Sequence, residues 1–328
     1  MSDGSGPVRW GIIGCGDVTE KKSGPGFQKA AGSELVAVMR RNGDLARDYA
    51  ERHGVPRWYN DAATLIADPE VDAVYVATPP SSHLQYTRMA AEAGKPVYVE
   101  KPMALDAAEA EAMVNACEAA GVGLYIAYYR RGLPRFRRVA ELVAGGAIGR
   151  VRTVSTQYWR PPAEPGTDGW RVDPSLAGAG YFADLASHTL DFLDFLLGAV
   201  AETQGFAANQ AGLYDAEDAV SADFRYESGV LGTGMWCFTT GTSRDVTEVV
   251  GNEGAVRFSS FTTDPIELET AAGVEMIAID NPQHVQQPLI QMVTDELHGS
   301  GRSPSTGRSA LRTARVMDTI LSDYYRRG

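Results

Sequence analysis

Lys101 is the residue of this chain whose position says most about chemistry. It stands between Glu100 and Pro102, directly after the apolar run 96–99, which reads as a buried parallel strand. Active sites of doubly wound α/β domains lie beyond the carboxyl ends of their strands. A cation at such a point lies where a nucleotide cofactor and its substrate meet. The position of Lys101 therefore points to an enzyme, and most directly to a nicotinamide-dependent oxidoreductase.

A second cluster combines a carboxylate with an imidazole. Asp184 and His188 are four residues apart in a segment that predicts a helix from about 181 to 197, so both project from one face of it. Histidine exchanges a proton near neutral pH, and a nearby carboxylate can orient it or bind substrate. A satisfied polar pair in the core is the alternative interpretation.

A glycine-rich turn follows the first predicted strand, residues 9–13. Gly14 and Gly16 allow the backbone to turn tightly and approach a pyrophosphate at the start of the next helix. The third glycine position of the usual pattern is Thr19, and a purely structural turn is the alternative. The residues that we expect to contact the cofactor here are Gly14, Cys15, Gly16, Asp17 and Val18.

The residues after the second predicted strand, 34–39, bear on the type of cofactor. NAD enzymes usually place an acidic residue there, but this chain has Arg40 and Arg41, with no carboxylate before Asp44. Arginine can pair with a 2′-phosphate that an acid would repel. We therefore expect NADP(H) to be preferred, with NAD(H) possible. Ordinary surface arginines are the alternative.

The order of apolar patterns predicts two domains. Residues 1–127 alternate apolar runs with helical patterns, which is typical of a doubly wound parallel α/β sheet. Residues 128–306 contain alternating strands and one helix, which predicts an α+β domain with an open, mainly antiparallel sheet. The amphipathic segment 307–328 is expected to pack on one of the two domains, and a return to the first is possible. A helix beginning near Ser81 or Ser82 is expected to end at Gly94.

Composition excludes several classes of function. The net charge of −12 argues against a nucleic-acid partner and against docking on anionic lipid. Three scattered cysteines suit the cytoplasm, and the histidine spacing predicts no metal site. One local exception is a group of five arginines between 130 and 138. A solvated helix face at a domain junction is the favoured interpretation, and contact with an anionic group is the alternative.

Taken together, the motifs resemble the Gfo/Idh/MocA family of oxidoreductases, which includes glucose–fructose oxidoreductase and inositol dehydrogenase. The resemblance covers essentially the whole length. Its residues are the glycine turn, 77–80 with His83, 100–102, 178–180 through Asp184 to His188, and 304–307. It implies a Rossmann-type first domain and a second sheet domain that often forms oligomer contacts, here a homodimer or homotetramer.

The resemblance also implies roles for individual residues. Lys101 would bind the reacting oxygen beside the nicotinamide, His188 would be the general acid/base, and Asp184 would orient substrate and imidazole. Further residues implied in cofactor binding are Thr78, Pro79, Pro80, His83, Glu100 and Lys101. Residues expected to face substrate are Lys101, Tyr129, Tyr158, Trp170, Arg171, Asp184 and His188. The chain departs from the family pattern at Ala179 and at Tyr129, where many members have glycine and asparagine.

The expected activity is hydride transfer between nicotinamide and a carbonyl or hydroxyl carbon of a sugar, polyol or sugar-derived ketone. Two alternatives stay open. One is an enzyme of the same fold that holds its cofactor tightly and uses transient oxidation for elimination or glycosidic cleavage. The other is a non-catalytic protein that senses NADP(H), against which the presence of Lys101, Asp184 and His188 counts.

Overall fold

The computed structural model describes residues 6–164, 166–167 and 169–325, which divide into two compact units. Unit 1 combines the chain up to 104 with 108–133 and 282–311, and unit 2 combines 105–107 with 134–281 and the residues from 312 onward. This division differs from the boundary expected at 127/128, because 282–311 returns to unit 1. The last helix, α11 (Gly307–Tyr325), begins in unit 1 and continues in unit 2, and 326–328 lie outside the described residues.

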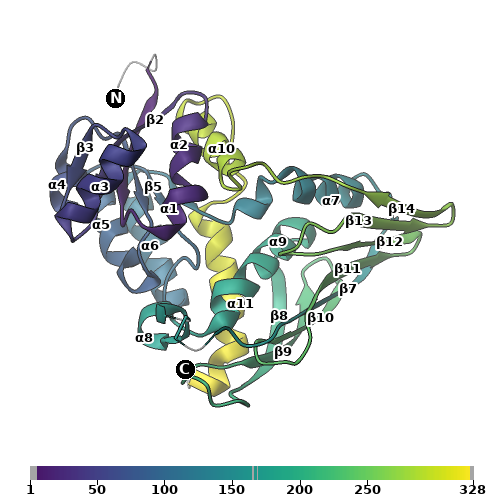
Figure 1. Ribbon diagram of the computed structural model, residues 1–328. Coiled ribbons are helices and arrows are strands. Elements are labelled where there is room, and N and C mark those ends of the chain that lie inside the picture. The colour runs from purple at the N-terminus through teal and green to yellow at the C-terminus, as the bar shows by residue number, and fades with distance from the viewer. Residues whose placement is uncertain (1–5, 165, 168, 326–328) are drawn as a thin grey trace. The chain divides into compact units, whose positions relative to one another are not determined.

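Unit 1 is built on a six-stranded parallel sheet with the order β3-β2-β1-β4-β5-β6 (Figure 1). Its strands are β1 Val8–Ile13, β2 Ser33–Met39, β3 Arg57–Tyr59, β4 Ala73–Val76, β5 Val97–Val99 and β6 Leu124–Ile126. This order is that of a Rossmann dinucleotide-binding domain, so the predicted fold of the first domain is confirmed. The short edge strand β3 was missed because its three residues are not fully buried and form no apolar run.

Helices cover the sheet of unit 1. They are α1 Asp17–Lys21, α2 Gly24–Lys29, α3 Gly43–His53, α4 Ala62–Ala67, η1 Pro80–Ser82, α5 His83–Glu92, α6 Ala107–Ala120, η2 Tyr129–Arg131 and α10 Gln287–Leu297. Gly94, in the left-handed region at φ 71°, follows α5 as expected. The expected serine cap is wrong: Ser82 precedes α5, but its hydroxyl donates to Thr78 Oγ1 at 2.8 Å.

Aromatic side chains fill the core between the sheet and α2. Trp10, Phe27, Tyr75 and Tyr98 are all fully buried, with the Trp10 and Phe27 rings 4.8 Å apart and those of Tyr75 and Tyr98 5.3 Å apart. Gly26 of α2 lets α10 approach closely, because a Cβ there would lie 2.8 Å from the side chain of Ile290. The returning segment is thus part of the core of unit 1.

Unit 2 contains an eight-stranded sheet with the order β14-β13-β12-β11-β7-β10-β9-β8 (Figure 1). Its strands are β7 Val151–Trp159, β8 Val200–Ala208, β9 Ala219–Tyr226, β10 Leu231–Cys237, β11 Arg244–Gly251, β12 Gly254–Phe258, β13 Ile266–Thr270 and β14 Gly273–Ile277. All neighbours are antiparallel except β10 and β7, which confirms the mainly antiparallel sheet that was predicted.

Unit 2 also contains helices. They are α7 Pro134–Ala144, η3 Gly169–Val172, α8 Pro174–Ala177, the π-helical turn η4 Phe182–Ala186, α9 Ser187–Leu197 and the greater part of α11. Phe182 lies 5.1 Å from Trp236 of β10, and Phe136 of α7 lies 4.9 Å from Phe192 of α9. The expectation of a single helix in this domain was incomplete, because α7 and the short α8 also belong to unit 2.

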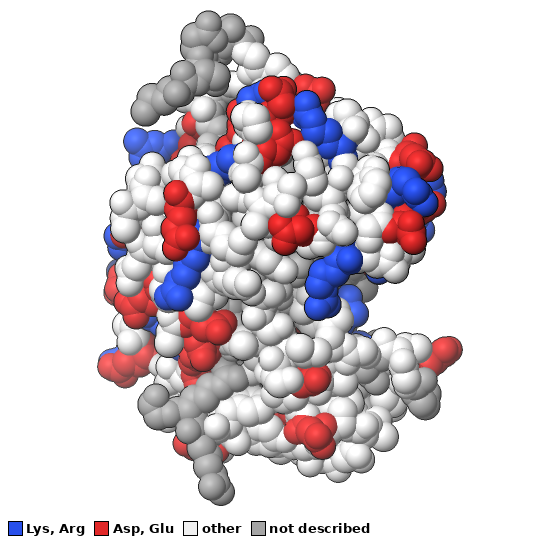
Figure 2. Space-filling view, turned by 90° about the vertical axis from the view of Figure 1, so that its left-hand side faces the viewer, with Lys and Arg blue, Asp and Glu red and all other residues white. Residues whose placement is uncertain are grey.

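Charges are mixed on the surface. Lysine and arginine are interspersed with aspartate and glutamate over the face in Figure 2, so the described residues there form no broad field of one sign. Among the helices that the structure describes, none has the length and apolar content needed to cross a membrane.

Candidate functional site

The glycine turn after β1 is shaped by the neighbouring loop. Gly14 has φ 89°, and a Cβ there would lie 2.7 Å from Cγ2 of Thr78. Backbone conformation and the approach of the 77–78 loop therefore both require glycine at this position. The N–H groups of Gly14 and Cys15 donate to the Met39 carbonyl at 2.9 and 3.1 Å, which ties the turn to the end of β2.

Gly16 is different, because nothing in this chain requires glycine there. Its φ of −158° is ordinary extended backbone, and a Cβ would meet only the Gly14 carbonyl, at 3.8 Å. The open space beside Gly16 is what close approach of a pyrophosphate needs. Thr19, in the third glycine position, is buried and its hydroxyl accepts from the Gly16 N–H at 3.0 Å. The turn therefore fits a dinucleotide.

Arg40 and Arg41 lie exposed at the end of β2. Within the described part of the chain their side chains make no hydrogen bond or ion pair. Burial raises the pKa of the Cys15 thiol in the glycine turn to about 11. The positive charge of Arg40 acts in the opposite direction and lowers this pKa, but its effect is smaller than that of burial. Two cationic side chains thus stand beside the predicted cofactor site.

The 78–80 loop follows β4 and is held from within. His83 is fully buried, with Nε2 2.8 Å from the Thr78 carbonyl and Nδ1 3.1 Å from the Met103 carbonyl. Burial lowers its pKa, and the neutral ring that results donates only one of these two bonds. The buried His83 ring thus helps to position Thr78 and the preceding strand end, and its expected contact with the cofactor stays a prediction.

Glu100 and Lys101 lie directly beyond β5, at the carboxyl edge of the sheet. The Glu100 carboxylate is buried, and Oε1 accepts from the Tyr75 hydroxyl at 2.5 Å and from Gln286 Nε2 at 2.6 Å, while Oε2 accepts from the Lys101 N–H at 3.2 Å. Burial and the negative charge of Glu100 raise the pKa of Tyr75 well above its usual range. The lysine side chain itself is half-buried.

Gln286 is fixed in turn by Tyr98, whose hydroxyl lies 3.4 Å from Gln286 Oε1. Its amide N–H groups therefore face the carboxylate, which can only accept. Sequence reasoning did not find Gln286, because it is one glutamine 186 residues from Glu100 in a segment with no motif. A buried carboxylate such as Glu100 needs donors, and that requirement alone could have prompted a search for partners.

In unit 2, Asp184 and His188 lie on either side of the junction between η4 and α9. The i,i+4 helix predicted for them is thus π-helical at Asp184 and becomes α-helical only from Ser187. Such π turns occur frequently at functional sites. Both side chains are largely buried, and Asp184 Oδ2 lies 3.4 Å from Arg171 Nε. The structure therefore brings Asp184 into contact with Arg171, a second residue that was predicted to face substrate.

Two glycines place the start of this segment. Gly178 has φ 84°, and a Cβ there would lie 2.2 Å from the Leu105 carbonyl. The Gly180 N–H donates to the buried Glu217 carboxylate, with both oxygens at 3.0 Å, and the Tyr325 hydroxyl donates to Glu217 Oε2 at 2.5 Å. Ala179 stands between them and is buried without disturbing either contact. These glycines are therefore required by close packing.

The aromatic residues expected to face substrate are partly exposed. Trp170 lies under the Arg171 guanidinium at 5.0 Å, and Tyr129, in unit 1, lies 5.2 Å from that of Arg130. The Tyr158 ring is 4.6 Å from that of Phe261, which in turn is 6.3 Å from the His188 ring. Phe261 was not predicted, because an isolated phenylalanine in a polar loop matches no motif.

The interpretation of the arginine cluster as a solvated helix face is wrong for three of its members. Arg130, Arg131 and Arg135 are only 4, 3 and 2% exposed, and Arg137 and Arg138 are half-buried. Arg131 donates to the Pro304 carbonyl at 3.0 Å within unit 1. Arg135 donates to carbonyls of 259–264 within unit 2. The physical reason is that guanidinium groups can be buried when carbonyls accept their hydrogen bonds.

Comparison with known proteins bears on both halves of the chain. Residues 8–128 match the Gfo/Idh/MocA oxidoreductase family, NAD-binding Rossmann fold, and 136–257 match the C-terminal domain of the same family. The chain is 38% identical over 320 residues to oxidoreductase P35 of Formosa agariphila, covering 95% of this chain and 98% of that one. It is 30% identical over 315 residues to 1,5-anhydro-D-fructose reductase of Ensifer adhaerens, covering 92% of each.

Among solved structures, the aldose–aldose oxidoreductase of Caulobacter crescentus, complexed with glycerol, superposes with a TM-score of 0.86. The sequence identity is 25%, and 98% of each chain is covered. The glycine turn, the buried Glu100 beside Lys101 and the Asp184–His188 pair thus occur in a chain that matches one family over both domains. The protein belongs to the Gfo/Idh/MocA family of NAD(P)-dependent oxidoreductases.

Proposed function

We propose that this oxidoreductase transfers hydride between NADP(H) and a carbonyl or hydroxyl carbon of a sugar, polyol or sugar-derived ketone. The observation that carries the proposal is the placement of Lys101 beyond β5, beside a carboxylate that three donors hold in place. The 1,5-anhydro-D-fructose reductase and aldose–aldose oxidoreductase relatives support a carbohydrate-like substrate. Three free cysteines, two of them buried, fit a cytoplasmic enzyme.

The bound nicotinamide would supply or accept the hydride. In the reductive direction, the Lys101 ammonium would stabilise negative charge developing on the substrate oxygen. His188 would give that oxygen a proton, and Asp184 would orient the imidazole and bind a substrate hydroxyl.

NADP(H) preference is the second part of the proposal. Arg40 and Arg41 are exposed beside the glycine turn, and the nearest following carboxylate, Asp44, is engaged by Arg47 at 3.1 Å. A 2′-phosphate would therefore meet two guanidinium groups and no competing acid. NAD(H) use at lower efficiency is compatible with the same site.

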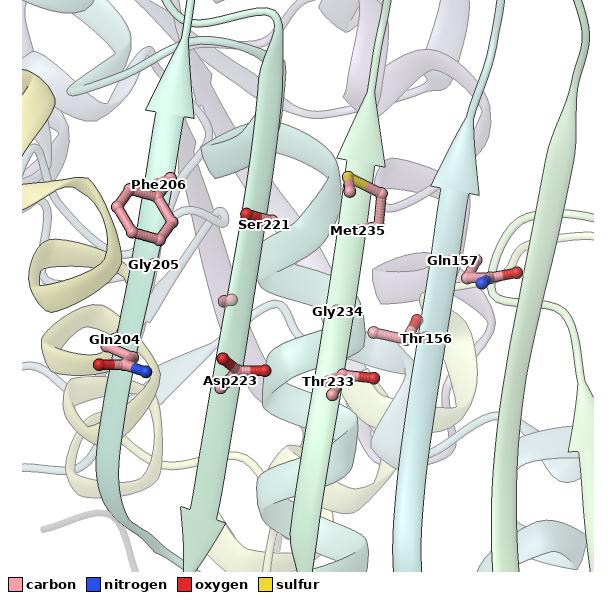
Figure 3. Close-up of a pocket in the computed structure, with 11 residues that line it drawn as sticks. Thr156, Gln157, Gln204, Gly205, Phe206, Ser221, Asp223, Thr233, Gly234 and Met235 are labelled. Carbon is pink, nitrogen blue, oxygen red and sulfur yellow. The ribbon is translucent and has the colours of Figure 1, made fainter.

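Self-association through the sheet of unit 2 is the third part. The face shown in Figure 3 is lined by small polar residues together with Phe206 and Met235, which are 75 and 45% exposed. The face forms a hollow of 320 Å³ that spans β7 to β8. We propose that a second copy of the chain covers it, giving a homodimer or homotetramer, because exposed apolar side chains on a broad sheet favour burial.

The proposed activity is tested by a panel of sugars, polyols and 1,2-dicarbonyls, monitored by nicotinamide absorbance with both cofactors. We expect turnover of at least one ring sugar or its ketone, and Lys101→Ala is expected to lower kcat about a hundredfold while NADPH still binds. Lys22→Ala, an exposed lysine in the same unit, is the matched control. Near wild-type turnover in Lys101→Ala would contradict the assigned role.

The same panel separates the alternatives. Product formation without added nicotinamide, by protein purified with bound cofactor, would indicate transient oxidation for elimination or glycosidic cleavage. Cofactor binding with no turnover of any compound would favour a sensing role.

A further inference from the structure

The loop 259–264, between β12 and β13, is held by side chains of two other segments, Arg135 of α7 and Asp245 of β11. Asp245 Oδ1 accepts from the Ser260 N–H at 2.8 Å, and Oδ2 accepts from the N–H groups of Phe261 and Thr262 at 2.6 and 3.1 Å. One carboxylate thus holds three consecutive backbone donors, an arrangement that fixes the path of the loop at Phe261.

A buried guanidinium holds the same loop from its carbonyl side. Arg135 Nη1 donates to the carbonyls of Ser259 and Thr262 at 2.8 and 3.0 Å, and Nη2 donates to Ser259 Oγ and the Asp264 carbonyl at 2.8 and 2.6 Å. The planar fork of arginine suits such multiple acceptors, and its loss would leave several buried groups unpaired.

The anchored loop is also tied to the proposed proton donor. Thr189, the residue after His188, donates to Ser260 Oγ at 3.0 Å. The Phe261 ring lies 6.3 Å from the His188 ring and 4.6 Å from the Tyr158 ring. Tyr158 is the register partner of Asp245 on neighbouring strands, so the carboxylate that holds Phe261 also belongs to the strand pair that carries Tyr158.

Phe261 and Tyr158 differ from the core aromatics of unit 2. Phe182, Phe192 and Trp236 are no more than 1% exposed, whereas Tyr158 and Phe261, whose ring lies beside that of His188, keep part of their surface accessible. A purely structural role does not need an accessible aromatic face on a loop fixed by a buried arginine and a partly buried aspartate. Binding of a ligand with an apolar C–H face does need such an accessible aromatic face. A side chain that is already held in place loses little conformational entropy when the ligand binds.

We propose that Phe261, with Tyr158, forms an aromatic wall beside His188 that selects cyclic substrates over open-chain ones. A pyranose or similar ring presents an apolar face of C–H groups to such a wall, while its hydroxyls remain available to Asp184 and Arg171. An open-chain dicarbonyl offers no comparable face. This inference rests on the proposed function and narrows its substrate class to ring compounds.

The test compares Phe261→Ala, Phe261→Leu and Phe261→Tyr with wild type, using 1,5-anhydro-D-fructose as the ring probe and methylglyoxal as the open-chain probe. For Phe261→Ala we expect KM for the ring probe to rise about tenfold, with KM for methylglyoxal changed less than about twofold. The pH profile of kcat should be unchanged, because His188 is retained. Phe261→Tyr should keep the wild-type preference for the ring probe, and Phe261→Leu should lose it.

Melting temperatures of all variants, measured by circular dichroism, control for folding, and Phe195→Ala is a matched aromatic control elsewhere in unit 2. Equal changes for both probes, or wild-type ring preference in Phe261→Leu, would overturn the inference. A thermal-shift titration with the ring probe separates the two proposals. If wild type binds the ring probe without turning it over and Phe261→Ala loses binding, the role of Phe261 is supported and the proposed hydride transfer to this ring is contradicted. If wild type neither binds nor turns over the ring probe, the wall is refuted.

Discussion

Glu100 and its partners show how single residues from distant segments support one another. The Tyr75 hydroxyl has one proton, and the 2.5 Å distance assigns it to Glu100, so Ser23 Oγ, 3.1 Å away, is placed to donate to Tyr75. Together with Gln286, this forms a chain of donors that ends on the carboxylate beside Lys101. Removing one donor leaves a buried charge with fewer hydrogen bonds.

Gln286→Leu is therefore expected to reduce the free energy of unfolding by about 1–3 kcal/mol and to lower kcat by displacing Lys101. Chemical denaturation and steady-state kinetics measure the two effects. Gln283→Leu, an exposed glutamine in the same loop, serves as control. Unchanged stability and kcat in Gln286→Leu would show that the amide contributes little to holding the carboxylate.

Arg40 and Arg41 can be tested by cofactor preference. The double variant Arg40→Ser/Arg41→Ser is expected to raise KM for NADPH at least about tenfold and to leave KM for NADH nearly unchanged, since only NADPH carries the 2′-phosphate. Arg88→Ser, an exposed arginine on α5, controls for loss of surface charge. If both cofactors are affected alike, these arginines do not read the phosphate.

Among the elements, the regular patterns were predictable and the irregular ones were not. Apolar runs correctly placed β1, β2 and β5, and the alternation of apolar and polar residues after 128 correctly predicted a mainly antiparallel sheet. The strands β3, β13 and β14 have only three to five residues, and in β8 apolar and polar residues do not alternate, so the periodicity of all four is weak. The π-helical turn at Asp184 has no sequence signature, since it arises from packing of the segment as a whole.

The same division holds for the candidate site. Lys101, Asp184 and His188 could be selected because charged residues stand out in apolar surroundings. Their supports could not, because Gln286, Glu217 and Asp245 act through contacts between segments far apart in the chain. Glycine motifs were found, but the partner that makes Gly178 necessary, the Leu105 carbonyl, is visible only in the fold.

The contact between α1 and α3 predicts a pH dependence. Glu20 accepts from Arg52 at 2.8 Å and lies 2.7 Å from His53 Nε2, and the Arg52 hydrogen bonds in particular lower its pKa from 4.5 to about 2. Because the folded pKa is depressed, the stabilisation is complete above about pH 4.5 and is lost as the pH falls towards 2.

Glu20→Gln should accordingly have a lower melting temperature than wild type at pH 7, and the gap should narrow below pH 4. Calorimetry across this range measures it, with Glu51→Gln, an exposed glutamate on α3, as control. A gap that stays constant down to pH 2.5 would show that the ion pair does not contribute.

At the scale of the whole molecule, the exposed face of the unit 2 sheet predicts assembly. Phe206 of β8 and Met235 of β10 are both register partners of Ser221 on β9, which lies between their strands. Substituting Phe206 and Met235 together therefore changes the charge at the centre of this face. Phe206→Glu/Met235→Glu is expected to shift the protein towards monomer in analytical ultracentrifugation, because a second copy would have to bury like charges. Leu45→Glu, on α3 of unit 1, should leave the assembly unchanged. An unaltered sedimentation profile in the double variant would place the contact elsewhere.

The return of 282–311 to unit 1 has a consequence for synthesis on the ribosome. Gln286 is made 186 residues after Glu100, its hydrogen-bond partner. Ile290 of α10 is likewise made long after Gly26 of α2, against which it packs. Until segment 282–311 has been synthesised, the nascent unit 1 therefore has a carboxylate without its glutamine donor and an aromatic core that α10 does not yet cover. Chaperone dependence during this interval, and intolerance of carboxyl-terminal truncation, follow from the order in which the chain emerges.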